Sequence, residues 1–132
     1  MQSQAHRARP GQAPTKPHSV RCLEETWIKA KRQSDLDDVT MNYAITELLE
    51  GYARGFLNLP MAGIKKPKSG AERAAAHSIR CTDELWNSAK RRAKSEGITM
   101  NDVIVGIMDA YARGLMNLPT VTKSFVRTKE LQ

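Results

Sequence analysis

Apolar side chains recur along this chain with two different spacings, and each spacing occurs twice. From His18 to Cys22, and again from His77 to Cys81, apolar and polar residues alternate. Strict alternation is the pattern of a strand with one buried face. After each of these stretches the spacing changes to that of helices, so we expect two short strands, each followed by two helices.

The first helix after each strand has different end signals in the two copies. In the second copy Thr82 is a favourable N-cap, two acidic residues follow it, and Gly97 is suited to the residue just past the helix. The apolar positions between them are Leu85, Trp86, Ala89 and Ala93. In the first copy Leu23 occupies the cap and Asp38 replaces the glycine, so we expect this helix to be frayed.

The second helix of each copy starts at a threonine, Thr40 or Thr99, which can cap it. An apolar stripe at helical spacing follows in both copies. It consists of Met41, Ile45, Leu48, Tyr52 and Phe56, and of Met100, Ile104, Ile107, Tyr111 and Leu115. We expect the sequence Asn-Leu-Pro, which ends both stripes, to terminate the two helices.

The two halves are copies of one sequence. A shift of 59 positions aligns residues 18–60 with residues 77–119 without a gap, and about twenty of some forty-three pairs are identical. Two units are too few for a solenoid, which needs about three or more. The chain therefore divides into a disordered basic arm (1–17), repeat 1 (18–60), a basic linker (61–76), repeat 2 (77–119) and a C-terminal tail (120–132).

Charge points to a polyanionic partner. Lysine and arginine outnumber the acids 21 to 14, for a net charge of +7, and all of this excess lies outside the repeats, in the arm, the linker and the tail. The cations expected to contact a polyanion are Arg7, Arg9 and Lys16 of the arm and Lys65, Lys66 and Lys68 of the linker. With no apolar run long enough for a membrane span and no secretory signal, we expect a cytoplasmic protein with reduced cysteines and no membrane partner.

The order strand, helix, turn, helix, with RCTDELW at the first junction and EGITMNDVI at the second, resembles the ribbon-helix-helix family of DNA-binding proteins. The resemblance covers both repeats, about two thirds of the chain. It implies a mainly α (α+β) fold in which the tandem repeats form an intramolecular pseudo-dimer, with one two-stranded antiparallel ribbon and four helices. It also implies sequence-selective binding of double-stranded DNA by insertion of the ribbon into the major groove, as in a transcriptional regulator or repressor.

The resemblance assigns roles to particular residues. The residues expected to contact bases are Ser19, Arg21, Ser78 and Arg80, and the two arginines are the stronger readers because a guanidinium can bind guanine through two hydrogen bonds. Next along the same face stand Pro17 and Ala76, so direct readout is expected to be limited. The residues expected to hold phosphates at the start of each second helix are Thr40, Met41, Asn42, Thr99, Met100 and Asn101. His18 and His77, at the ends of the ribbon, are further candidates for phosphate contact.

Other interpretations of these residues are weaker. For Arg21 and Arg80 the alternative is that of ordinary solvated strand residues, and Trp27 and Trp86 are expected to pack in the core rather than to stack on bases. A zinc site made of two histidines and two cysteines fails on geometry. A ribbon centred near Ser19 and Ser78 holds the cysteines on the order of 20 Å apart, too far for a shared metal or a disulfide. We expect no metal, no cofactor and no enzymatic activity, since no catalytic motif is recognisable.

Two other functions stay open. A partition or architectural protein would coat DNA cooperatively, and side-by-side self-association on DNA is possible. An antitoxin-like protein would bind a partner toxin through its tail, where Val121, Phe125 and Val126 form a small apolar set. RNA is a poor partner, because the major groove of A-form helices is too narrow for a ribbon.

Overall fold

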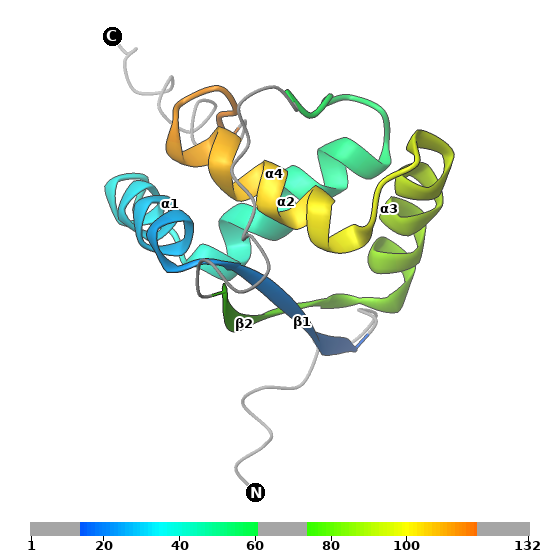
Figure 1. The fold of residues 1–132 in the computed structure, drawn as a ribbon, viewed down its shortest axis with the longest axis horizontal. Coiled ribbons are helices and arrows are strands. Elements are labelled where there is room, and N and C mark those ends of the chain that lie inside the picture. Colours follow the sequence, from blue (N-terminus) through cyan, green and yellow to red (C-terminus); the bar gives the residue numbers. More distant parts are fainter. Residues whose placement is uncertain (1–13, 61–73, 119–132) are drawn as a thin grey trace, which may run out of the picture.

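The computed structural model describes residues 14–60 and 74–118. The elements in chain order are β1 (Thr15–Leu23), α1 (Glu24–Leu36), α2 (Met41–Ala53), β2 (Ala74–Thr82), α3 (Asp83–Glu96) and α4 (Met100–Ala112). The two strands form a ribbon along one side of the molecule, and the four helices lie together on its other side (Figure 1). The fold is mixed α+β and mainly helical, as expected.

The ribbon is antiparallel, and its register follows the repeat. Ser19 pairs with Ser78, its equivalent in the other repeat, so equivalent residues lie symmetrically about this pair. The expected centre of the ribbon is therefore confirmed. The expected length is wrong, because each strand has nine residues rather than five. Thr15–Pro17 has no alternating apolar pattern of its own and belongs to β1 because it pairs with Arg80–Thr82. The alternation within one strand therefore could not predict where the strand begins.

The first helices of the repeats begin and end differently, as their sequences predict. The Thr82 hydroxyl accepts a hydrogen bond of 3.1 Å from the Leu85 N–H, whereas Leu23 at the start of α1 makes no side-chain cap. Gly97 ends α3 with φ of 75°, a left-handed conformation that glycine adopts without strain. After α1 the left-handed residue is Asp38, at φ 60°. α1 is nevertheless a regular helix of 13 residues.

The central helices α2 and α4 are capped as expected but end earlier. The Thr40 and Thr99 hydroxyls both accept hydrogen bonds from the first turn. Both helices stop near Gly55 and Gly114, which have φ of 86° and 78° and turn the chain away. The residues that follow, Phe56 and Leu115, are therefore 74% and 57% exposed, and their expected place in the apolar stripe is wrong.

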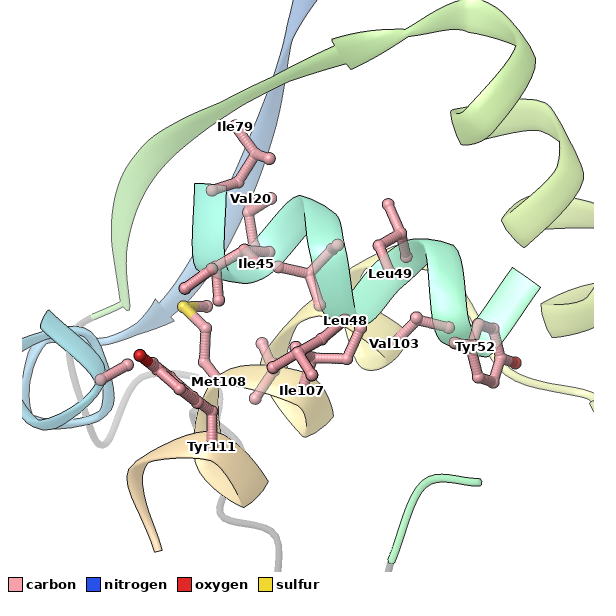
Figure 2. Close-up of a cluster of buried hydrophobic side chains, with 14 of the residues drawn as sticks. Val20, Ile45, Leu48, Leu49, Tyr52, Ile79, Val103, Ile107, Met108 and Tyr111 are labelled. Carbon is pink, nitrogen blue, oxygen red and sulfur yellow. The ribbon is translucent and has the colours of Figure 1, made fainter. Parts of the chain in front are cut away.

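The core joins residues from both repeats. α1 packs on α4, α3 packs on α2, and α2 crosses α4 at the centre. Figure 2 shows side chains of α2 and α4 meeting in this core, with two ribbon residues, Val20 and Ile79, above them. The apolar face of each strand is thus covered by helices, and the opposite face of the ribbon is left to solvent. Within residues 14–60 and 74–118, no helix is both long and apolar enough to cross a bilayer.

Candidate nucleic-acid interface

The outward face of the ribbon carries the four side chains expected to contact bases. Ser19 and Arg21 on β1, and Ser78 and Arg80 on β2, are exposed. The alternate residues Val20, Cys22, Ile79 and Cys81 are buried against the helices. The strands therefore present one polar face that includes two guanidinium groups, one toward each end of the ribbon.

The Arg80 side chain is held along the ribbon by the neighbouring strand. Its Nη2 donates a hydrogen bond of 3.0 Å to the carbonyl oxygen of Thr15, and its Nε lies 3.4 Å from the Thr15 hydroxyl. Thr15 is the first residue of β1 and pairs with Thr82, so this contact belongs to the end of the ribbon. The Arg80 side chain is thus tied to the start of β1, although the residue remains exposed.

Two asparagines link the central helices to these arginines. The Arg80 N–H donates to Asn42 Oδ1 (2.7 Å), and Asn42 Nδ2 donates to the Arg80 carbonyl (3.0 Å). In the other half the Arg21 N–H donates to Asn101 Oδ1 (2.8 Å), and Asn101 Nδ2 donates to the Arg21 carbonyl (2.9 Å). Each asparagine side chain therefore replaces a missing neighbouring strand. The repeated letters Thr-Met-Asn marked these positions, but one repeat alone does not reveal a contact made to the other.

The start of each central helix lies beside a ribbon end because of these contacts. Asn42 and Asn101 are the second residues of α2 and α4. The backbone N–H groups of a helix's first turn can bind an anion, and threonine caps use only one of them. The two starts differ at the third helical residue. In α2 it is Tyr43; in α4 it is Asp102, whose carboxylate accepts a hydrogen bond of 3.1 Å from the Thr99 N–H.

Two histidines stack on the tryptophans of the opposite repeat. The His18 and Trp86 ring centroids are 3.9 Å apart, those of His77 and Trp27 are 3.7 Å apart, and the two ring planes of each pair are nearly parallel. His77 Nε2 also lies 3.3 Å from Glu24, whereas His18 Nε2 is buried without a partner. Both histidines lie next to the central Ser19–Ser78 pair, so their expected place at the ends of the ribbon is wrong. The stacks therefore tie the middle of the ribbon to helices α1 and α3, and the expected phosphate contact of the histidines stays a prediction.

Most of the cations of the arm and linker lie outside the described residues. These are Arg7, Arg9, Lys65, Lys66 and Lys68. Lys16 is described: it belongs to β1 and its ammonium lies 3.0 Å from Asp83, an exposed ion pair. Lys16 is therefore part of the ribbon rather than of the basic arm to which the sequence assigned it.

The cysteines are buried core residues without a disulfide. Cys22 pairs with Ala75 and Cys81 with Lys16, so six ladder steps, on the order of 20 Å, separate them. Burial raises the pKa of the Cys22 thiol to about 11 and also raises the pKa of Cys81. No group of metal-ligating side chains is found in the described part of the chain.

A cavity of about 570 Å³ opens beside one ribbon end. It lies between α2, α3 and β2, and its walls include Arg80, Asn42, Thr46 and Thr82. The positions equivalent to the two threonines in the other half are Val105 and Leu23, which are apolar and buried. The two halves therefore differ in polarity at these two positions, which are threonines beside Arg80 and buried apolar residues in the other half.

Comparison of the chain with protein-family models, curated proteins and solved structures gives no match.

Proposed function

We propose that this protein binds double-stranded DNA sequence-selectively, with its ribbon in the major groove, and acts as a transcriptional regulator. The observation that carries the proposal is the outward face of the ribbon, where Arg21 and Arg80 are exposed on a rigid, helix-backed pair of strands. Paired strands lie about 4.8 Å apart. A ribbon of this width fits a major groove about 12 Å wide.

The starts of α2 and α4 support the same function. The contacts of Asn42 and Asn101 place one helix N-terminus beside each end of the ribbon. A ribbon lying in the groove has the phosphate backbones on either side of it, so each N-terminus is suited to bind a phosphate through Met41 and Asn42 or through Met100 and Asn101. Phosphate contacts would fix the orientation of the protein, and the arginines would read the bases.

We also propose that the repeats form an intramolecular pseudo-dimer in solution. Three kinds of contact support this, since each occurs once in each direction between the repeats. They are the paired hydrogen bonds from Asn42 and Asn101 to the backbone of one arginine each, called the asparagine clamps below, the histidine–tryptophan stacks, and the hydrogen bonds of Tyr52 and Tyr111 to the acidic residues Glu96 at the end of α3 and Asp37 just after α1. Neither strand has a partner within its own repeat, so one repeat alone leaves its strand unpaired. Joining both repeats in one chain makes their association independent of protein concentration.

Selection from a pool of random duplexes tests the DNA-binding function. We expect enrichment of one short site, bound by one protein molecule, with a footprint of constant length as protein concentration rises. A footprint that spreads along flanking DNA would favour the coating function instead. Failure of the protein to enrich any sequence would reject selective binding.

A further inference from the structure

The side chains of Asn42 and Asn101 do something that an anion-binding helix start does not require. An N-terminus binds a phosphate through its backbone N–H groups, whatever the second side chain is. Here both side chains turn to the ribbon, and each makes two hydrogen bonds of 2.7–3.0 Å to the backbone of one arginine. The arginine is in each case the residue with the exposed guanidinium.

The hydrogen bonds meet a specific need of the ribbon. In an antiparallel pair every second residue of each strand turns its N–H and C=O away from its partner. On a two-stranded ribbon such groups would otherwise face only solvent at the strand edge. The primary amide of asparagine offers one acceptor and two donors, so it can match both groups of one residue. Asn42 and Asn101 therefore fix the Cα positions from which the two arginine side chains extend.

The clamps also cross between the repeats. Asn42 of repeat 1 holds Arg80 of repeat 2, and Asn101 of repeat 2 holds Arg21 of repeat 1. The phosphate-binding start of each helix and the arginine beside it thus share one rigid connection. A phosphate bound at α2 would set the position of Arg80, and a phosphate bound at α4 would set that of Arg21.

We infer that Asn42 and Asn101 are positioning residues for base recognition, each acting on the arginine of the opposite repeat. This inference rests on the proposed DNA-binding function. A bidentate contact between guanidinium and guanine tolerates little displacement of the side chain. Loss of one clamp should therefore weaken base preference at one end of the site only.

A double-mutant cycle on the selected DNA site tests the inference. Asn42→Ala should lower affinity about 5- to 30-fold, and should reduce the preference for the base pair that Arg80→Ala identifies. Preference at the base pair identified by Arg21→Ala should change less than about 2-fold. The Asn42→Ala and Arg80→Ala effects should be strongly non-additive, whereas those of Asn42→Ala and Arg21→Ala should multiply. Asn101→Ala should give the mirror-image result.

A matched control separates positioning from stability. Tyr52→Phe removes one interior hydrogen bond, to Glu96, and should lower the melting temperature without changing base preference at either end. All affinities are measured well below the melting temperature of each variant. If Asn42→Ala does not fold, Asn42→Ser, which keeps one polar group at the site, takes its place in the cycle.

The outcomes distinguish this inference from the function on which it rests. Wild-type protein that selects no sequence would reject the DNA-binding proposal itself. Selective wild-type protein whose clamp variants lose affinity equally on every sequence, with additive effects in both cycles, would overturn the positioning role. Loss of preference confined to the arginine of the opposite repeat supports it.

Discussion

The two tyrosines at equivalent positions of the central helices are held in unequal ways. Tyr52 of α2 donates a hydrogen bond of 2.7 Å to Glu96, and Arg92 lies over its ring, 4.2 Å from the centroid. Arg92 also donates to the carbonyl of Tyr52 in the last turn of α2, at 2.6 Å, and to the carbonyl of Leu57 in the segment after α2, at 2.8 Å. The hydrogen bond from Tyr52 lowers the pKa of Glu96.

The other half has the tyrosine and the acid but lacks the cation. Tyr111 of α4 donates to Asp37 at 2.6 Å, and the residue equivalent to Arg92 is Gln33, whose amide reaches Asp37 at 3.2 Å. A guanidinium at a helix C-terminus donates hydrogen bonds to carbonyls that have no partner within the helix. Its positive charge is also attracted to the negative end of the helix dipole. The shared apolar core thus determines the fold in both halves. The polar contacts that hold α3 against α2 and α1 against α4 have diverged.

The N-termini of α2 and α4 also differ, and here the additional stabilising contact belongs to α4. Asp102 completes a capping box at α4, which stabilises that helix but brings a negative charge to the end that we propose binds phosphate. α2 has no acidic residue in its first turn. The half that contains α2 should therefore hold phosphate more tightly, and the comparison predicts unequal contributions of the two halves to both stability and DNA binding.

The largest expected effect is at Arg92. Arg92→Gln copies the residue of the other half and should lower the free energy of unfolding by about 2–3 kcal/mol, because charge-assisted hydrogen bonds to the end of α2 are lost. Gln33→Ala, the matched control, should cost less than about 1 kcal/mol, because it removes one long neutral hydrogen bond. Urea denaturation measures both. Equal costs would contradict the claim that Arg92 stabilises its half more than Gln33 stabilises the other.

Exchange of the third helical residues should separate DNA affinity from stability. Asp102→Asn should tighten DNA binding about 3- to 10-fold, since a carboxylate about 6 Å from a phosphate costs on the order of 1 kcal/mol. The helix itself should become slightly less stable. Tyr43→Asp should do the reverse, with a new capping box at Thr40 and weaker binding. Asp109→Asn removes the same charge near the other end of α4 and should change affinity much less. Affinity and stability that change in the same direction would contradict the assignment.

Alkaline pH should destabilise the protein through its buried thiols. Because burial raises the pKa of Cys22 from about 9.0 to about 11, the unfolded state loses its thiol proton first. Stability is then fully present below pH 9 and is lost as the pH rises toward 11. From about pH 7.5 to about pH 9.5 we expect a loss of about 1 kcal/mol from Cys22, measured by denaturation. Cys22→Ala should lose this part of the pH dependence; an unchanged slope would mean that the thiol is accessible.

The smallest expected effect is at the end of α1. Asp38 has a left-handed backbone at φ 60°, where its equivalent, Gly97, has no strain. Asp38→Gly should raise stability by about 0.5 kcal/mol, because the relief of strain exceeds the added entropy of the unfolded chain only slightly. Gly97→Asp should lower it. Thermal melting of both variants checks the sign, and a destabilised Asp38→Gly would point to a favourable contact of that carboxylate.

The sequence predicts more of the fold than of the candidate interface. Alternation around Val20 and Ile79 and the repeat offset predicted the strands and their register, because a two-fold arrangement places equivalent residues opposite each other. The ends of the central helices were missed, because the spacing of Phe56 and Leu115 continues the stripe although the glycines before them have already turned the chain.

The exposed arginines of the interface could be predicted, but the contacts that orient them could not. The clamp from Asn42, the stack of His18 on Trp86 and the bonds of Arg92 all join one repeat to the other. Periodicity describes which face of an element is buried and says nothing of which polar side chain lies opposite. Such pairs require the packed arrangement of all four helices.

A binding titration of Arg21→Ala and Arg80→Ala tests the central claim most directly. Each variant is measured against the selected DNA site and a scrambled duplex. Each should lose about 1–3 kcal/mol on the selected site, and each should relax preference at a different base pair, because the arginines lie in opposite halves of the ribbon. Affinity for the scrambled duplex should change much less. If both variants lose affinity equally on the two duplexes, the ribbon does not read bases, and recognition in the major groove is contradicted.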